Sequence, residues 1–254
     1  MSQERPMPSG IYAVLIADVV ASSTRADVRA LLGKKLAAAS KRHLDQKLIR
    51  LPYSVTAGDE FQTVAGELPS LPDLLLGLRS LLQPLSLRIG VGIGRISGRS
   101  QPPVNRLSGE AFQFARRAIE SIKRGRLFKF DVLTAFASRD ESFNSTINLI
   151  YGLHDTLVLQ ITPKQWEAIG TLLKIPPRLW EVIGAMEGLT PTRSESMEGM
   201  IARRSILGRP KLRQAARRLR LDISTVSRNL KRGYYWQLME TARIAGSFIA
   251  RTFD

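Results

Sequence analysis

The chain has 254 residues, 44% of them apolar, and no cysteine, which excludes disulfides, thiolate metal sites and a cysteine nucleophile. Its 38 Lys and Arg exceed its 22 Asp and Glu, and the resulting net charge of +16 favours a polyanionic partner. No run of about eighteen apolar residues is present, and the first apolar stretch lacks the flanks of a signal peptide. We therefore expect a cytoplasmic protein with no membrane span.

The first half of the chain alternates between strand-like and helix-like segments. Residues 11–20 are apolar and β-branched, which predicts a buried strand, and residues 24–47 carry apolar side chains on one helical face. The further elements expected are a hairpin around the turn AGDE within 48–66, a helix at 70–83, a strand at 85–96, a helix at 109–124 and a strand at 126–136. This βαββαβ order with a final addition predicts an α+β, ferredoxin-like domain over residues 1–137, with its helices on one face of an antiparallel sheet.

Glycines at 90, 92 and 94 alternate along one of these expected strands. They do not open a helix, so they do not form a dinucleotide-binding fingerprint. Alternating glycines on one face of a strand indicate that a helix or a ligand approaches the strand closely.

Near residue 138 the sequence becomes polar and turn-rich, and we expect a second, all-α domain over residues 138–254. Helices are predicted at 142–156, 163–174 and 177–187, followed by a loop at 190–200 and a helix-turn-helix at about 211–232. The residues expected to fill the space between the two helices of that motif are Ala216, Leu219, Leu221, Val226 and Leu230. Asp222 or Ser224 is expected to cap the second helix.

Much of the excess charge lies in one segment, residues 203–232, which holds eleven Lys or Arg and one acidic residue, Asp222. A basic segment that contains a helix-turn-helix favours double-stranded DNA as a partner; the alternative is a basic helical hairpin that only packs. On the exposed face of the second helix, side chains can reach base edges and phosphates. The residues expected to contact DNA are Arg217, Ser224, Thr225, Ser227, Arg228, Asn229, Lys231 and Arg232.

Two carboxylates are expected to meet at one edge of the sheet. Asp18 ends the first strand, which is central in this layout, and Asp59 lies in the turn of the neighbouring hairpin. Two carboxylates this close repel each other unless they share a proton or bind a divalent cation, and Mg²⁺ suits such oxygen ligands. The sequence thus predicts a magnesium site at Asp18 and Asp59. The alternative is that Asp18 caps the following loop and Asp59 is an ordinary turn residue.

Several ordered features carry a family resemblance. They are Asp18 after the first strand, the turn Gly58-Asp59-Glu60-Phe61-Gln62, the segment 88–94, and the helix-opening residues Gly109, Ala111, Phe112, Ala115 and Arg116. Over residues 11–135 the chain resembles the SatD family and, through it, the catalytic palm of class III nucleotidyl cyclases and GGDEF diguanylate cyclases. The resemblance implies a nucleotide ligand or substrate, for which the contacting residues would be Gly58, Glu60, Gln113, Arg116 and Arg117.

The chain departs from the cyclase pattern where cyclases read the purine. The adenine-selecting Lys and Asp are replaced by Val55 and Arg106, the ribose-steadying Asn by Gln113, and the first Gly of GGDEF by Ala57. These departures speak against an adenylyl or diguanylate cyclase of the usual kind.

The sequence therefore favours a DNA-binding regulator whose cyclase-like domain binds a nucleotide with Mg²⁺ and tunes DNA binding. One alternative is a nucleotidyl cyclase or polymerase-like enzyme that acts on nucleoside triphosphates, and another is a palm that serves only as a dimerisation scaffold. A homodimer is expected, because cyclase-type sites form between two palms and helix-turn-helix proteins favour twofold sites.

Overall fold

The computed structural model describes residues 10–20, 26–98, 103–174 and 211–253. The chain divides into two compact units, one formed by Met1–Gln160 with Trp236–Asp254 and the other by Ile161–Tyr235. We call the first the sheet unit and the second the helical unit. This division differs from the boundary expected after residue 137. The helix expected at 177–187 and the loop at 190–200 lie outside the described residues.

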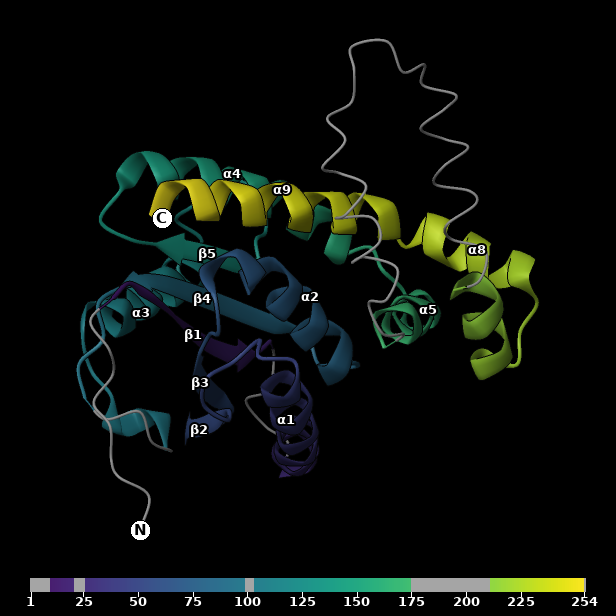
Figure 1. The fold of residues 1–254 in the computed structure, drawn as a ribbon, viewed down its shortest axis with the longest axis horizontal. Helices are drawn as coiled ribbons and strands as arrows, with labels where there is room; N and C mark the ends of the chain where they lie inside the picture. The colour runs from purple at the N-terminus through teal and green to yellow at the C-terminus, as the bar shows by residue number, and fades with distance from the viewer. Residues whose placement is uncertain (1–9, 21–25, 99–102, 175–210, 254) are drawn as a thin grey trace. The chain divides into compact units, whose positions relative to one another are not determined.

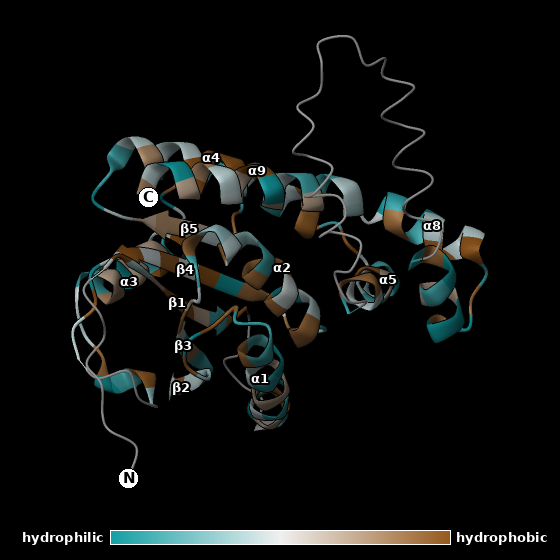
Figure 2. Ribbon diagram, viewed as in Figure 1, coloured by the Kyte–Doolittle hydropathy of each residue, from teal (hydrophilic) through white to brown (hydrophobic). Residues whose placement is uncertain are grey.

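A mixed sheet forms the centre of the sheet unit (Figure 1). Its described strands are β1 (Tyr12–Val19), β2 (Ser54–Ala57), β3 (Glu60–Val64), β4 (Leu87–Gly94) and β5 (Thr134–Ala137), in the order β2-β3-β1-β4-β5. β1 pairs antiparallel with β3 and β4, whereas β5 pairs parallel with β4. The sheet is therefore mixed, which corrects the expectation of an antiparallel sheet. β2 and β3 form the expected hairpin, whose turn holds Gly58 at a φ of 62°. β4 and β5 are coloured largely as hydrophobic in Figure 2, in keeping with their burial.

Helices cover both faces of this sheet, which corrects the expectation of helices on one face only. The described α-helices of the unit are α1 (Ala26–Asp45), α2 (Leu71–Leu82), α3 (Glu110–Lys123), α4 (Glu141–Val158) and α9 (Tyr235–Phe253). The first residue of α9, Tyr235, is assigned to the helical unit. Alternate residues of β1 point to opposite faces. Leu15 packs into one core with α1 and α2, and Val14 packs into another with α3.

The glycines of β4 explain how α3 packs on the second face. A Cβ atom on Gly92 would lie 2.0 Å from the carbonyl oxygen of Ala111, and one on Gly90 would lie 2.5 Å from the backbone nitrogen of Ile119. A side chain at either position would push α3 off the sheet, so the expected close approach of a helix is confirmed. α3 runs along β4, and Lys123, four residues after Ile119, reaches the end of the sheet where Asp18 lies.

The last strand is shorter than expected, and the chain before it packs on a helix instead. β5 begins at Thr134, whereas the segment expected as a strand begins at residue 126. Phe128 and Phe130 stack on each other, and both rings lie close to Gly152 of α4. Phe128 and Phe130, which lie in a segment with the sequence pattern of a strand, thus pack on α4 instead.

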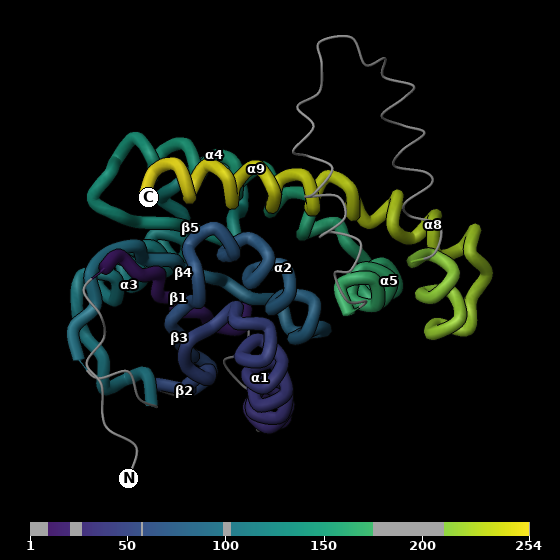
Figure 3. The backbone as a smooth tube through the Cα atoms, viewed as in Figure 1, coloured from purple at the N-terminus to yellow at the C-terminus, as the bar shows by residue number. Residues whose placement is uncertain are grey.

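α9 and α4, which are far apart in the sequence, lie side by side in the sheet unit (Figure 3). The ring of Phe143 in α4 stacks on Phe248 with 5.4 Å between centroids and meets Phe253 edge-on at 4.8 Å. The carboxylate of Asp155 in α4 accepts hydrogen bonds from the backbone N–H groups of Leu133 and Thr134, at 2.7 and 2.6 Å. These contacts hold both helices to the sheet, and they are the reason that the observed division differs from the expected boundary.

The described part of the helical unit consists of α5 (Pro163–Leu173), a helical stretch at 211–219, and α8 (Ile223–Arg232). Ala216, Val226 and Leu230 are buried as the sequence predicts, and Leu219 is half-buried. Ile169 of α5 is also buried, so α5 contributes to the same small unit. None of the helices described is long and apolar enough to cross a membrane.

The turn between the last two helical stretches contains a residue in a left-handed conformation. Arg220 has a φ of 54°, which favours glycine. The N–H groups of Arg220 and Leu221 donate to the carbonyl oxygens of Arg217 and Ala216, at 3.3 and 3.0 Å, and this pair of bonds is a Schellman motif. Leu221 is 42% exposed, which corrects its expected burial, because it lies in this turn directly before Asp222, the N-cap residue of α8.

Candidate functional site

Three charged side chains form a row across the sheet at one end of β1. The register pairs Asp18 with Arg88 of β4, and it pairs Ala17 with Phe61 of β3. Glu60, one residue before Phe61, therefore lies beside Asp18 on the other side. The side chain of Asp18 is only 6% exposed, so its charge needs a compensating partner.

Basic side chains surround both carboxylates of this row. Arg88 Nε donates to Asp18 Oδ1 at 2.9 Å, and Lys123 Nζ lies 2.6 Å from Asp18 Oδ2. Arg116 donates to Glu60 through both of its Nη atoms, at 2.6 and 2.8 Å. Lys123 Nζ also lies 4.0 Å from Glu60 Oε2. The buried charge of Asp18 is thus compensated by protein side chains.

The pairing of Glu60 with Arg116 shifts the pKa of both groups. Burial raises the pKa of Glu60, but the hydrogen bonds and charge of Arg116, with smaller effects from Thr56 and Lys123, lower it overall. The hydrogen bond to Glu60 raises the pKa of Arg116. Both groups therefore stay charged near neutral pH, and this bidentate pair ties α3 to the start of β3.

The hairpin turn meets the end of β1, as the sequence predicts. Asp59 Oδ2 accepts a hydrogen bond from the N–H of Val19 at 3.2 Å, which brings Asp59 next to Asp18 along the backbone. Gly58 in the same turn lies near Arg29 of α1, whose guanidinium nitrogen would be 3.8 Å from a Cβ atom on Gly58.

The donor atoms at this end of the sheet fit a divalent cation poorly. Mg²⁺ takes oxygen ligands at about 2.0–2.1 Å in octahedral geometry. Both carboxylate oxygens of Asp18 already contact basic groups, and one oxygen of Asp59 accepts a hydrogen bond from a backbone N–H. Among the residues that the structure describes, no group of three or more His, Asp or Glu is placed to hold a metal ion. The magnesium site at Asp18 and Asp59 stays a prediction of the sequence.

Gln113 and Arg117 are the two remaining residues expected at the nucleotide site. Gln113 is exposed on α3, three residues before Arg116. Arg117 faces another part of the unit, where its guanidinium donates to the carbonyl oxygen of Ser138 at 3.3 Å and lies 3.8 Å from Glu141. The structure therefore brings Glu60 and Arg116 together and leaves Arg117 apart.

Sequence reasoning missed Arg88 and Lys123 as members of this site. The register carries the signal for Arg88, which stands opposite Asp18 when the two strands pair antiparallel. The signal for Lys123 is its spacing, since it continues a row of every fourth residue along α3. Both signals can be used only once it is known that β4 pairs with β1 and that α3 runs towards Asp18.

A comparison with known protein families identifies the family of this chain. The model of the SatD family matches residues 12–177, which is more than half of the sequence. This chain belongs to the SatD family. The match confirms the resemblance to the SatD family, and it includes the row formed by Asp18, Glu60 and Arg88 but not the segment 211–235. A comparison with curated proteins finds no match.

Two solved structures show low similarity to this SatD-family chain. A bacterial light-regulated adenylyl cyclase is 13% identical, with a TM-score of 0.33, over 52% of this chain and 76% of its own. A regulator of polyketide synthase expression from Bifidobacterium adolescentis is 13% identical, with a TM-score of 0.27, over 94% of this chain and 82% of its own. Similarity at this level establishes neither a shared fold nor a shared function.

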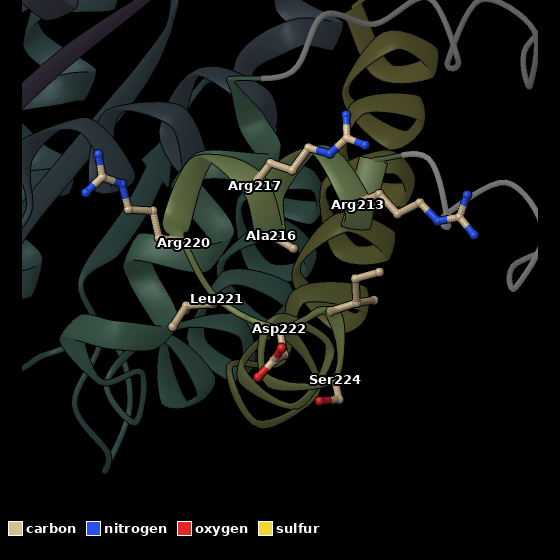
Figure 4. A pocket seen from close by; sticks show the side chains of 8 residues that line it. Arg213, Ala216, Arg217, Arg220, Leu221, Asp222 and Ser224 are labelled. Carbon is tan, nitrogen blue, oxygen red and sulfur yellow. The ribbon is translucent and has the colours of Figure 1, made fainter.

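The helical unit of the SatD-family chain carries a second candidate site, at the turn before α8 (Figure 4). An open groove of about 700 Å³ is lined by Arg213, Ala216, Arg217, Arg220, Leu221, Asp222, Ile223 and Ser224. In Figure 4, Arg213 and Arg217 extend towards one end of the helical stretch 211–219, and Arg220 extends away from the opposite end, where the turn begins. Arginines spread along an open groove are suited to the regularly spaced phosphates of a nucleic acid. Of these arginines, the sequence prediction names Arg217 as a DNA contact and does not name Arg213 or Arg220.

α8 has an apolar inner face and a polar outer face. Val226 and Leu230 are its buried residues. Of the residues expected to contact DNA, Arg217, Ser224, Ser227, Arg228, Lys231 and Arg232 are exposed, and Thr225 and Asn229 are half-buried. The outer face thus offers hydroxyl groups and cations to a partner, and DNA as that partner stays a prediction.

Proposed function

We propose that this SatD-family protein is a DNA-binding regulator. The helical unit acts as a helix-turn-helix that contacts duplex DNA through α8, and the sheet unit binds a nucleotide that changes the affinity for DNA. The observation that carries the proposal is the outer face of α8, where Ser227, Arg228 and Lys231 are exposed while Val226 and Leu230 anchor the helix from behind.

The chemistry of these side chains supports a division of labour between phosphates and bases. Arg213, Arg217 and Arg220 flank the groove before α8, where they can contact phosphates and orient the unit on the duplex. Ser227 and Arg228 lie further along α8, and an arginine of this kind can pair with a guanine edge in the major groove. Phosphate contacts also predict that binding weakens steeply with salt.

The test is DNA binding by the full chain, measured by fluorescence anisotropy on random-sequence duplex at several salt concentrations. We expect the triple variant Ser227→Ala, Arg228→Ala, Lys231→Ala to lose most of its binding. On a specific duplex selected from the random pool, Arg228→Ala alone should cost about 1–3 kcal/mol. Lys231→Ala alone should reduce the slope of log affinity against log salt by about 1. A matched control removes two exposed lysines of α1, Lys34 and Lys41, so that the same charge is lost from the sheet unit.

Two outcomes would contradict the proposal. Full binding by the triple variant would show that α8 does not contact DNA. An equal loss in the Lys34 and Lys41 control would show that only the net charge matters. The control should instead bind nearly as well as the natural sequence.

The enzymatic alternative has less support from the site. A nucleotidyl cyclase or polymerase-like enzyme needs carboxylates that can hold a metal and a triphosphate. Asp18 and Glu60 are instead ion-paired with Arg88, Lys123 and Arg116. A homodimer is part of the proposal, because two copies of α8 would match a twofold DNA site. Sedimentation of the free protein tests it.

A further inference from the structure

Lys123 lies between two acidic side chains in the position of a bridging cation. Its Nζ atom is 2.6 Å from Asp18 Oδ2 and 4.0 Å from Glu60 Oε2. Asp18 is buried, and Lys123 approaches it from the last turn of α3. The lysine side chain is 37% exposed, so its stem reaches inward from the surface of the unit.

Every carboxylate oxygen of this pair is in contact with a basic group. Asp18 Oδ1 accepts from Arg88 and Oδ2 contacts Lys123, while the two oxygens of Glu60 accept from the two Nη atoms of Arg116. A divalent cation that bridged Asp18 and Glu60 would have to displace Lys123 from Asp18. It would also have to compete with two guanidinium groups that are held in place by hydrogen bonds.

Basic groups already outnumber the carboxylates in this cluster. Asp18 and Glu60 are two acidic groups, and they contact the three basic groups of Arg88, Arg116 and Lys123. A divalent cation added to this arrangement would lie within a few ångströms of fixed positive charges. At such distances the repulsion is large in a partly buried site, where water screens it weakly.

We infer that Lys123 serves as a built-in cation in place of a divalent metal ion, so that the sheet unit keeps its Asp18 and Glu60 carboxylates together without one. This inference goes beyond the proposed DNA-binding function and does not depend on it. It has a consequence that a merely structural lysine would not have. Removing the ammonium group should create a cation site at Asp18 and Glu60 that the natural sequence lacks.

The test compares the thermal stability of the full chain with and without Mn²⁺ or Mg²⁺. The natural sequence should show no rise in Tm and no Mn²⁺ binding by electron paramagnetic resonance. Lys123→Met keeps the length of the stem and removes the charge, and it should bind Mn²⁺. Its Tm should rise by about 5 °C or more at a Mn²⁺ concentration a hundred times the dissociation constant. The double variant Asp18→Asn, Lys123→Met should lose this response, and Lys123→Arg should never acquire it.

Each outcome decides the inference. Mn²⁺ binding by the natural sequence that Asp18→Asn abolishes would overturn it and would support the magnesium site expected from the sequence. Folded Lys123→Met protein that ignores Mn²⁺ would also overturn it, because the lysine would then be an ordinary ion-pair partner. If Lys123→Met folds only when Mn²⁺ is present, the ion replaces the missing ammonium group, as the inference requires.

Discussion

His43 is a buried histidine at the end of α1 that stays neutral in the folded chain. Its Nδ1 shares a hydrogen bond of 2.8 Å with the hydroxyl of Tyr53, and its Nε2 would lie 3.2 Å from a Cβ atom on Gly77 of α2. Burial, together with the charge of Arg42, lowers the pKa of His43 from 6.5 to about 4. A proton therefore binds the unfolded chain more readily than the folded one.

This difference predicts a loss of stability in mild acid. The contribution of neutral His43 is complete above the unfolded pKa of 6.5 and is lost as the pH falls towards the folded pKa of about 4. Over that window the loss approaches roughly 3 kcal/mol, of which about two thirds is reached by pH 5. His43→Gln retains a hydrogen-bonding group for Tyr53 and should remove most of this slope. Urea unfolding of both proteins at pH 7, 6 and 5 measures the effect, and equal slopes would contradict it.

At this scale the sequence identifies charged residues better than it identifies their partners. Asp18 stands out because a carboxylate at the end of an apolar strand is unusual, and Glu60 is implied by the family resemblance; the structure brings both into one row. Arg88 and Lys123 do not stand out, because a basic residue is ordinary in a chain of charge +16. Their roles depend on strand register and on the course of α3, which are tertiary properties.

Among the elements, the turn before α8 carries a strain that substitution can relieve. Arg220 adopts a φ of 54°, where a side chain costs about 1–2 kcal/mol, and the Schellman hydrogen bonds hold it there. We expect Arg220→Gly to stabilise the helical unit by about 0.5–1 kcal/mol, since the added freedom of glycine in the unfolded chain offsets part of the gain. The shift of the unfolding transition in urea measures it.

Arg220→Ala is the matched control for that substitution. It removes the same charge and keeps the Cβ atom, so it should give little or no gain in stability. If alanine stabilises the unit as much as glycine does, relief of charge repulsion in the basic groove is the cause and the backbone argument fails. Both variants should weaken DNA binding to the same extent if Arg220 contacts phosphate.

The sequence predicts most elements but not which face or which unit each one joins. The spacing of apolar residues in α3 is the same whether it covers one face of the sheet or the other. The glycines at 90 and 92 indicate a close approach, but that the approaching element is α3 is visible only in three dimensions. α4 follows a polar stretch that resembles a linker, yet its Asp155 accepts hydrogen bonds from the backbone at the start of β5. A long-range hydrogen bond of this kind leaves no periodic signal.

For the whole molecule, the order of elements connects the proposed DNA-contacting helix directly to the sheet unit. α8 ends at Arg232 and α9 begins at Tyr235, so only two residues separate them. From Trp236 onward α9 belongs to the sheet unit, where Phe248 stacks on Phe143. So short a connection limits how far α8 can move without a change in α9, and it offers a physical route for a ligand of one unit to affect the other.

The regulatory part of the proposed function therefore predicts coupling between nucleotide and DNA. A ligand changes DNA affinity only by its difference in affinity for the two states, and coupling of about 1–3 kcal/mol corresponds to about 5–150-fold. The measurement is DNA affinity with saturating ATP, GTP, CTP or UTP in turn, and then the affinity of the nucleotide that binds, with and without saturating DNA. Reciprocity requires the same factor in both titrations.

Inserting Gly-Ser-Gly after Gly233 lengthens the two-residue connection between α8 and α9, and it should reduce that factor while leaving each binding event intact. A nucleotide that binds without changing DNA affinity would contradict the coupling, and its conversion to a product would favour the enzymatic alternative.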